Sequence, residues 1–518
     1  MLHFLPCAAG LATLCAADGD LAVVYGRLTP GDGQWTYRWA ARDDAPPNGG
    51  TVLAGAGPGC WRLCHNGTVS LQCFGVFGPD TPADDALDAL VNDAAVQCIQ
   101  VTTDVNFTRR HTFFRSRLTI DFTGHKVTAL GVAPAAHNDP FGGVLHFAGQ
   151  VGDAVRFLLR EPMPELYDIF EVPDTGRFPL YSWWQVAVNP LTGREEKEID
   201  KLLQVTEILD GRHLRVNYKM GWPLAAGRQM TWQAVQPVER VDICHMEFWG
   251  NPGGEAPGAH PLVFTHAVRC NVWDVHAYHT YWPVLLRRHN TGYVTERCSL
   301  TNPTEVVVGG TGYLTQQIHC LYGAVRDCTA HNARHLNDFT GSAYCLVENC
   351  HGDGDFHGAF VTHGQFEHDL TYLGNSGLLS FANSGPTWGS AAKRITVERH
   401  VGCWGIGFAK ISDLTLRDVT IVKTEKYDVC GKLELNADGL QVQGCTALAL
   451  VLTQRSRRAH RPTVIRDCWF RDGVHIVRSG DGAVDPALCL TFEQVTTDRQ
   501  EVFSPQIAPQ TQPCDTTF

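Results

Sequence analysis

The phrase TERCSL at residues 295–300 returns as VRDCTA at 325–330, VENCHG at 347–352, LRDVTI at 416–421 and IRDCWF at 465–470. Looser copies stand at 267–275 (AVRCNVWDV), 395–402 (ITVERHVG), 440–448 (LQVQGCTAL) and 490–498 (LTFEQVTTD). We place Cys270, Cys298, Cys328 and Cys350 in one register, with spacings of 28, 30 and 22 residues. The spacing from Cys445 to Cys468 is 23 residues. The chain therefore repeats one unit every 20 to 30 residues.

Each copy of the phrase alternates apolar and polar residues and then reaches Gly, Asn or Asp, which is typical of a short, half-buried strand that ends in a turn. Short strands at this period, without amphipathic helices between them, indicate a solenoid whose coils stack strand on strand. A β-sandwich with irregular strands is the alternative. A sandwich, however, has no reason to repeat V-x-[DN]-C at one register, so we predict an all-β solenoid.

Composition limits the partners and the compartment. The chain has 518 residues and a net charge of −12, which argues against nucleic acid as a partner. No apolar run has the length of a membrane span, and no Lys or Arg precedes the apolar start, so we expect no secretory signal. The 19 cysteines show no CxxC pair and no zinc-site spacing. We expect reduced, buried thiols made in a reducing cytosol rather than a disulfide scaffold.

The repeated phrases resemble coils of the right-handed parallel β-helix of the pectate-lyase-like superfamily. Residues 73–94 (CFGVFGPDTPADDALDALVNDA) resemble the opening segment of such proteins, with Asp84 and Asp85 as its paired aspartates and a replaced closing glycine. Residues 97–107 and 115–129 look like the first coils. Residues 23–63 resemble the small β-rich module of phage tailspike proteins. This resemblance implies a homotrimer on a virion tail, or an extracellular protein, that binds a cell-surface polysaccharide.

We therefore predict a right-handed parallel β-helix with two additions. The predicted segments are an N-terminal β-rich module (1–70), a short helix with the first coils (71–154), a β-rich insertion (155–236), the main β-helix (237–500) and a C-terminal tail (501–518). Hairpin turns are predicted at Asp210–Gly211 and near Gly221. Trp183, Trp184 and Trp222 of the insertion could form a platform for sugar rings, and packing in the insertion's own core is the alternative.

Residues 351–369 (HGDGDFHGAFVTHGQFEHD) concentrate four histidines, three aspartates and a glutamate. Within short strands of this stretch, ionisable residues alternate with phenylalanines, which predicts acids and imidazoles on the outer wall and Phe360 and Phe366 inside. Asp353 and Asp355, two residues apart on one face, approach the separation used by inverting glycoside hydrolases. We predict these two and Glu367 as catalytic carboxylates, with His357 and His363 assisting. A polar surface loop is the structural alternative.

Three functions stay open at this point. Paired carboxylates favour hydrolysis of a polysaccharide without a cofactor. A lyase acting on uronic-acid polymers could use the acidic cluster to hold Ca²⁺ and Arg457 and Arg458 to grip an anionic chain. A non-catalytic adhesin or structural appendage would only bind glycan. The sugar, the linkage, the host and the sharing of a site between subunits are not determined by the sequence.

Overall fold

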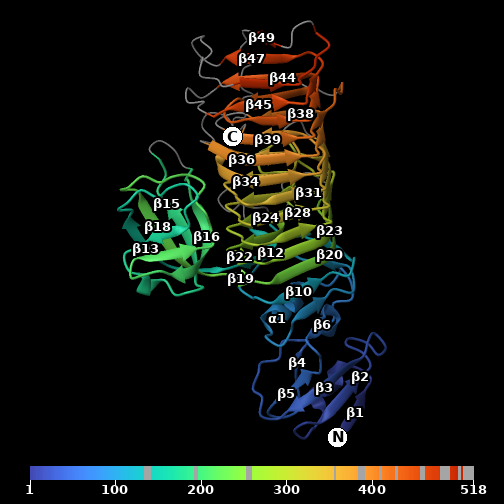
Figure 1. The fold of residues 1–518 in the computed structure, drawn as a ribbon. Helices are drawn as coiled ribbons and strands as arrows, with labels where there is room; N and C mark the ends of the chain where they lie inside the picture. The colour runs from blue at the N-terminus through green and yellow to red at the C-terminus, as the bar shows by residue number, and fades with distance from the viewer. Residues whose placement is uncertain are drawn as a thin grey trace.

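Figure 1 shows a tall column of stacked strands, with a small module below its N-terminal end and an insertion at its side. The computed structural model describes residues 1–133, 142–191, 196–251, 260–354, 358–382, 391–407, 411–425, 430–454, 461–478, 490–499 and 503–505. Within these residues no helix has the length and apolar character needed to cross a membrane.

One face of the column is a sheet of 13 parallel strands. In chain order they are β9 (His111–Phe113), β12 (Gly143–Ala148), β21 (His260–Thr265), β24 (Leu285–Arg288), β27 (Tyr313–Ile318), β30 (His335–Thr340), β33 (Phe360–Thr362), β35 (Leu379–Phe381), β38 (Trp404–Gly407), β41 (Lys432–Asn436), β44 (Ala449–Gln454), β47 (Val474–Arg478) and β49 (Phe503–Pro505).

The rest of the wall is a sheet of 19 strands, together with two smaller sheets of four and two strands. The large sheet comprises β6 (Thr68–Ser70), β7 (Cys98–Gln100), β8 (Val105–Asn106), β10 (Leu118–Asp121), β11 (Lys126–Thr128), β20 (Val241–Trp249), β23 (Asn271–Tyr278), β25 (Val294–Glu296), β26 (Ser299–Thr301), β28 (Ala324–Arg326), β29 (Thr329–Ala333), β31 (Leu346–Glu348), β32 (His351–Gly354), β34 (Gln365–Leu373), β36 (Ala391–Glu398), β39 (Ile411–Arg417), β42 (Gln441–Gln443), β45 (Thr463–Arg466) and β48 (Leu490–Glu493). The smaller groups are β37 (Val401–Gly402), β40 (Thr420–Ile421), β43 (Thr446–Ala447) and β46 (Trp469–Phe470), and β19 (Val238–Glu239) with β22 (Ala267–Val268).

A typical coil runs through β30, turns into β31, turns again into β32 and closes at β33 of the next coil. Parallel connections of this kind are right-handed in nearly all known sheets. The predicted right-handed parallel β-helix is confirmed. One continuous hydrophobic core fills the column from Val69 to Ile476.

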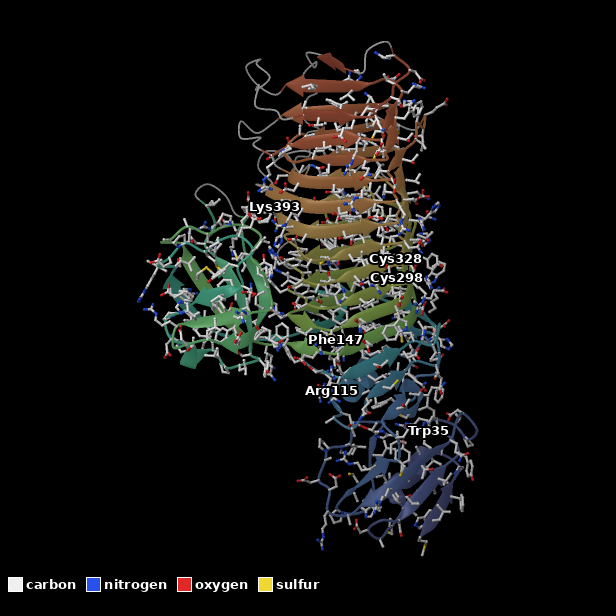
Figure 2. All side chains as sticks on the ribbon, in the orientation of Figure 1. Trp35, Arg115, Phe147, Cys298, Cys328 and Lys393 are labelled. Carbon is white, nitrogen blue, oxygen red and sulfur yellow. The ribbon has the colours of Figure 1, made fainter. Side chains whose placement is uncertain are left out.

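The repeated phrase marks the second corner of each coil. Its residue before the cysteine adopts a left-handed backbone, with φ between 50° and 53° at Arg297, Asp327, Asn349, Asp418 and Asp467. Asp and Asn enter this region more readily than most residues, which explains the [DN] position. The following cysteines point into the core, and Figure 2 shows Cys298 and Cys328 on neighbouring coils.

The register predicted for Cys270 is wrong. Val272 pairs with Thr295 and His276 with Ser299, so Val275 is the residue that lies across from Cys298. Cys270 falls at the preceding corner, directly after the left-handed Arg269, and Asp274 with φ of 52° takes the position of Arg297. The described cysteines are free thiols, and burial raises the pKa of Cys270 to about 11.

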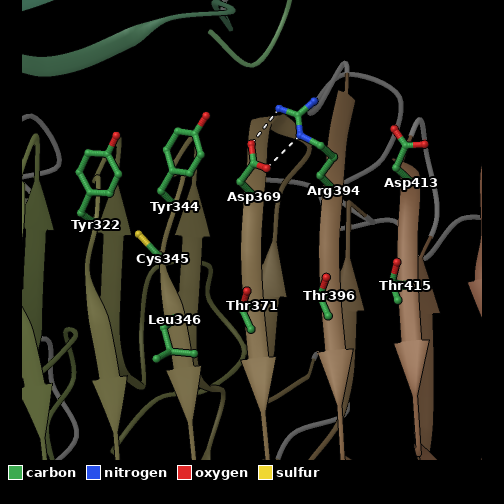
Figure 3. A pocket seen from close by; sticks show the side chains of 10 residues that line it. All are labelled: Tyr322, Tyr344, Cys345, Leu346, Asp369, Thr371, Arg394, Thr396, Asp413 and Thr415. Carbon is green, nitrogen blue, oxygen red and sulfur yellow. Dashed lines mark hydrogen bonds and ion pairs between the residues drawn. The ribbon is translucent and has the colours of Figure 1, made fainter. Parts of the chain in front are cut away.

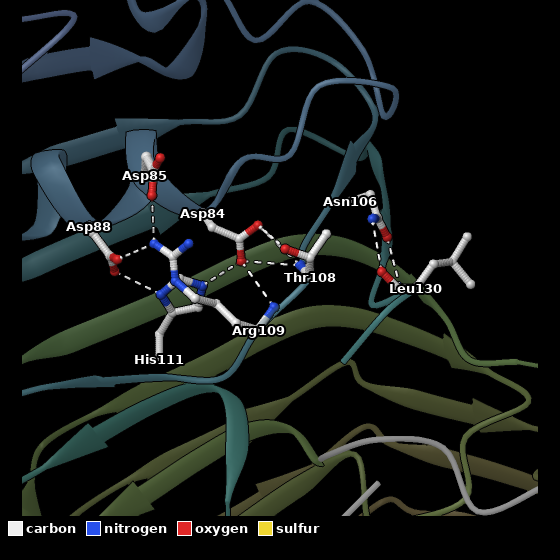
Figure 4. Close-up of polar contacts among 8 residues, drawn as sticks. All are labelled: Asp84, Asp85, Asp88, Asn106, Thr108, Arg109, His111 and Leu130. Atoms are coloured by element: carbon white, nitrogen blue, oxygen red, sulfur yellow. Dashed lines mark hydrogen bonds and ion pairs between the residues drawn. The ribbon is translucent and has the colours of Figure 1, made fainter. Parts of the chain in front are cut away.

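The first coil is covered by a short helix. α1 (Asp84–Asn92) places Leu87, Leu90 and Val91 in the core of the column. Figure 4 shows how the predicted aspartate pair holds it: the buried Asp84 carboxylate accepts hydrogen bonds from the Thr108 N–H at 3.1 Å and from His111 Nε2 at 3.0 Å. Burial acts to raise the pKa of Asp84, but these hydrogen bonds outweigh it and lower that pKa. Asp85 is exposed and pairs with Arg109.

The N-terminal module is a sheet in the order β1 (Leu2–Leu5), β2 (Leu21–Val24), β3 (Trp35–Ala40), β5 (Cys60–Leu63) and β4 (Val52–Ala54). Trp39, Trp61 and Tyr37 fill its core. The structure also has three short 3-10 helices. The N-terminal module contains η1 (Ala8–Thr13), the connection to α1 contains η2 (Leu71–Phe74), and the insertion contains η3 (Thr175–Arg177).

The insertion is a six-stranded antiparallel sheet beside the column. Its strands are β13 (Gln150–Leu158), β14 (Ile169–Glu171), β15 (Trp183–Val188), β16 (Asp200–Ile208), β17 (His213–Val216) and β18 (Gln229–Gln236). The turn predicted at Asp210–Gly211 joins β16 to β17. Leu321 and Ala343 of the coils belong to the same hydrophobic cluster as the insertion's Tyr218, so the insertion packs directly on the β-helix.

Candidate functional site

One column of corner residues lines the outer wall next to the insertion. Tyr322, Tyr344, Asp369, Arg394 and Asp413 stand at equivalent positions of successive coils, each with φ between 52° and 55°. The strands that follow are in register, with Thr371, Thr396 and Thr415 aligned on β34, β36 and β39. Figure 3 shows the two rows side by side, with all these side chains directed to the same side.

These rows form the floor of a groove that follows the axis of the column. Its main part encloses about 730 Å³ and is lined by Tyr322, Tyr344, Cys345, Leu346, Asp369, Thr371, Arg394, Thr396, Asp413 and Thr415. A further hollow of about 400 Å³ shares Asp413 and Thr415 and is also lined by Gly439, Gln441, Arg461 and Pro462. An elongated, open groove of this kind fits a linear polymer better than a small, enclosed ligand.

The charged groups of the groove are held in pairs. Arg394 makes a bidentate contact with Asp369, from Nε to Oδ1 at 2.9 Å and from Nη2 to Oδ2 at 2.8 Å. Its Nη1 donates to Glu165 of the insertion, and Lys393 Nζ lies 2.8 Å from Oε2 of that carboxylate. Bidentate pairing fixes the planar guanidinium in orientation as well as in charge. Glu165 thereby ties the insertion to the wall of the groove.

A buried histidine supports Asp369 from below. Burial lowers the pKa of His368 to about 4, so its ring is neutral at pH 7. His368 Nδ1 donates to Asp369 Oδ2 at 2.7 Å, which leaves Nε2 to accept from the Tyr218 hydroxyl at 2.7 Å. Burial acts to raise the pKa of Asp369, but the hydrogen bonds from His368 and Arg394 outweigh it and lower that pKa to about 2. Asp369 is therefore ionised at every pH at which the protein is expected to work.

Two tyrosines form the aromatic part of the groove. The rings of Tyr322 and Tyr344 are stacked, with centroids 5.3 Å apart and planes inclined by 16°. Their hydroxyls donate to the backbone oxygens of Asn217 at 2.6 Å and Lys219 at 3.0 Å in the insertion. Tyr322 is 41% exposed, and burial raises its pKa to about 12. The pair offers apolar ring surface beside hydrogen-bonding groups.

The predicted catalytic residues that the structure describes, Asp353, His363 and Glu367, do not line this groove. Asp353 lies on β32, beyond the second corner, where its carboxylate accepts from His331 Nδ1 and from the Asn332 N–H, each at 2.7 Å. Its side chain is 58% exposed. Asp355, His357, Arg457 and Arg458 lie outside the described residues. The catalytic role of Asp353 and Asp355, and a Ca²⁺ ion at that cluster, stay predictions.

His363 and Glu367 are brought together, but away from the outer wall. The Glu367 carboxylate is fully buried and accepts from the Gly341 N–H at 2.9 Å and the His363 N–H at 3.3 Å. Burial raises its pKa. His363 Nε2 lies 3.0 Å from the buried Asp338 of the previous coil. The prediction that the acids of this stretch line the outside is therefore wrong for Glu367.

The cause is the backbone of Phe366. Its φ of 64° interrupts the alternation of the strand, so Glu367 turns away from solvent. Phe366 faces the insertion instead of the core and contacts Trp222 at 5.1 Å between ring centroids. The inward direction predicted for Phe366 is wrong for the same reason. Phe360 does lie in the core, as predicted.

The predicted sugar platform is not an exposed surface. Trp184 is buried in the core of the insertion, 4.7 Å from the Phe178 ring. Trp183 packs against the cluster of Leu202, Val235 and Val268. Trp222 is half-buried at the junction, where the Lys393 ammonium lies 4.4 Å from its ring centroid. The aromatic rings of the groove are Tyr322 and Tyr344, which the sequence reasoning did not identify.

Comparison with known proteins supports the fold. No protein-family model matches the chain, and no curated protein matches it. Among solved structures, the tailspike Gp54 of Acinetobacter baumannii bacteriophage AP22, determined in complex with A. baumannii capsular saccharide, is similar with a TM-score of 0.57 at 12% identity, over 87% of this chain and 78% of that chain. The tailspike gp61 of Pseudomonas phage phi297 gives 0.56 at 12% identity, over 86% and 76%. The tailspike gp49 of Pseudomonas phage LKA1 gives 0.50 at 12%, over 83% and 72%.

Proposed function

We propose that the protein binds a cell-surface polysaccharide along the groove and cleaves it by glycoside hydrolysis. The observation that carries the proposal is the groove itself, an open channel of stacked tyrosines, paired charges and threonine hydroxyls that continues from Tyr322 to Arg461. Ring faces suit the C–H side of sugars, and the polar rows suit their hydroxyls. The similar tailspike solved with capsular saccharide supports the same substrate class.

The groove offers two carboxylates for the reaction, Asp369 and Asp413, on strands two coils apart. With a coil spacing of about 4.8 Å, their backbones are separated by about 9.6 Å, just above the roughly 6.5–9.5 Å that separates the two carboxyl groups of inverting hydrolases. Asp369 is held ionised, which suits it to stabilise the positive charge that develops on the sugar ring. We assign to Asp413 the protonation of the leaving glycosidic oxygen and to Asp369 the uptake of the proton from the attacking water, which forms the new bond to the sugar as the glycosidic bond breaks. Asp353 and Asp355 remain the competing pair.

The experiment compares two single variants, Asp413→Asn and Asp353→Asn, on a panel of bacterial capsular and other extracellular polysaccharides. We expect Asp413→Asn to reduce the release of new reducing ends by at least 100-fold, within the range seen for general acid–base groups, and Asp353→Asn to leave it within a few-fold of the wild type. Loss of activity in Asp353→Asn alone would move the site to the other face. An ultraviolet-absorbing unsaturated product would identify a lyase instead.

One observation favours a second candidate function, glycan binding without cleavage. Both groove carboxylates are ion-paired, Asp369 with Arg394 and Asp413 with Arg461. A non-catalytic adhesin needs such groups only as fixed hydrogen-bonding partners. Saturable binding on a glycan array, with no cleavage of the bound polysaccharide by the wild type, would establish this alternative.

The assembly state and the location of the protein are also proposed from the similar solved structures. We propose a homotrimer carried on a virion tail, because the similar solved structures are phage tailspikes. Light scattering after size-exclusion chromatography tests the trimer, and a mass of one or two chains would contradict it.

A further inference from the structure

A ladder of three histidines stands at the first corner of consecutive coils. His266, His289 and His319 each adopt a left-handed backbone, with φ of 49°, 52° and 56°. Their rings are stacked, with centroids 5.0 Å apart between the first pair and 5.1 Å between the second. The insertion covers Leu321, which stands between His319 and Tyr322 in the chain. The histidine corner and the groove therefore lie on opposite sides of this contact. The ladder faces strand β16.

One carboxylate of the insertion reaches into this ladder. Asp200, the first residue of β16, places Oδ1 2.8 Å from His289 Nε2 and Oδ2 3.9 Å from His319 Nε2. The side chains of Asp200, His289 and His319 are 10%, 2% and 20% exposed. Each offers one ligand atom, and the three atoms lie within 4.8 Å of one another. The 3.9 Å between Asp200 Oδ2 and His319 Nε2 is too long for a hydrogen bond.

The donor set is that of a divalent transition metal. Two imidazole nitrogens and one carboxylate oxygen, with a water as fourth ligand, are a common zinc environment, with metal–ligand distances of about 2.0–2.2 Å. Two ligands at that distance from one ion are separated by about 3–4 Å. The 3.9 Å between Asp200 Oδ2 and His319 Nε2 falls in this range, whereas the 2.8 Å contact between Asp200 Oδ1 and His289 Nε2 is a hydrogen bond that the ion would replace.

We propose that Asp200, His289 and His319 bind a divalent transition-metal ion such as Zn²⁺ and that this ion fastens the insertion to the β-helix. The nearby groups are compatible with it. Gln185 Nε2 donates to Asp200 Oδ1 at 2.8 Å and lies 3.1 Å from His289 Nε2, a contact that the ion would replace, and its Oε1 accepts from His266 Nε2 at 2.9 Å. Such second contacts orient the ligands of metal sites.

Two lysines near Asp200 leave room for the ion. The Lys201 ammonium donates to the Gly341 carbonyl rather than to the Asp200 carboxylate. Lys197 Nζ lies 3.5 Å from Asp200 Oδ2, but its side chain is 32% exposed and can turn into solvent. The ion would take over the charge that Lys197 now supplies.

The test is the metal content of the full-length protein. Protein stripped with a chelator is loaded with ZnCl₂, freed of excess metal by gel filtration and measured by elemental mass spectrometry. We expect about one zinc per chain, a single tetrahedral site of the usual kind. The variants His289→Gln and His319→Gln should weaken binding by at least 100-fold. The matched control His266→Gln, in the same ladder but not a ligand, should bind zinc within a few-fold of the wild type.

A second measurement keeps the proposal testable if a variant folds poorly. Co²⁺ added to the stripped wild type should give the intense visible absorption of a four-coordinate site, and Zn²⁺ should displace it. Wild-type protein that binds no zinc would overturn the proposal. So would zinc binding that survives both His289→Gln and His319→Gln, or that His266→Gln reduces as strongly as they do. This outcome is independent of whether the groove cleaves polysaccharide.

Discussion

Acid should loosen the contact between the insertion and the β-helix, and His368 sets the magnitude. The pKa of this buried ring is lowered to about 4 from its usual 6.5, mainly by burial, with the nearby Lys201 and Arg394 adding to the effect and Asp369 opposing it. An opened junction that hydrates the ring would restore the usual pKa. Between pH 6.5 and pH 4 the open form therefore binds a proton that the closed form does not, so falling pH favours opening.

The two pKa values give the size of the effect. From pH 7 to pH 5 the equilibrium for opening should rise about 20-fold, which corresponds to ~1.8 kcal/mol. Hydrogen exchange followed by mass spectrometry, corrected for the intrinsic pH dependence of exchange, reports this as a loss of protection in peptides around residues 217–222 and 366–372.

The control is His368→Gln, which removes the titrating ring but keeps a side chain able to hydrogen-bond. Its protection in the same peptides should change by no more than about 3-fold over the same range, because other groups of the junction contribute the remainder. A wild type that changes as little as this, or a variant that changes as much as the wild type, would refute the reasoning.

Two further substitutions test the junction and the cap. Gly221→Ala would place a methyl group 2.6 Å from His368 Nε2. We therefore expect the free energy of unfolding to fall by about 1–3 kcal/mol and the insertion to be proteolysed faster. In the control Gly211→Ala the methyl group meets open space, so neither change is expected. Asp84→Asn replaces a carboxylate that accepts several buried hydrogen bonds. The free energy of unfolding of the first coils, measured with denaturant, should therefore fall by about 2–3 kcal/mol. In the control Asp85→Asn, at an exposed position, this free energy should stay within about 0.5 kcal/mol of the wild type. An equal effect of the two substitutions in either comparison would contradict the assigned contacts.

The repeat predicted the fold because one phrase carries two physical requirements. Asp327 and Asn349 can take the left-handed corner, and Cys328 and Cys350 fill the small inward position behind it. Neither requirement depends on knowledge of the distant coils. Cys270 misled the register because it follows a left-handed residue of its own, Arg269, at the preceding corner, so that the local phrase looks the same.

The groove could have been located by counting. Its corner residues stand six positions before the inward residue of the next corner, as Tyr322 does before Cys328 and Tyr344 before Cys350. Applied to later coils, the same count reaches Asp413 from Val419. This spacing was present in the sequence, but the site was predicted in the dense polar stretch near residue 360 because ionisable residues are concentrated there. The side chains of that stretch lie on different faces of the coil.

The orientation of other residues could not be predicted. An aromatic residue with a left-handed backbone, such as Phe366, is rare, and it reverses the facing of Glu367. Trp183 and Trp184 are neighbours on one strand, so one of them had to be buried. Which one depends on the register of β15 against β18, a contact set by residues almost 50 positions later.

The helix at the start of the column has a consequence for solubility. A stack of parallel strands ends in a row of unpaired amide and carbonyl groups, which is a template for another molecule's strand and thus for fibrous aggregation. By laying Leu87 and Leu90 across the first coil, α1 removes that template. A chain lacking this helix should therefore polymerise end to end, with thioflavin-positive filaments as the visible result.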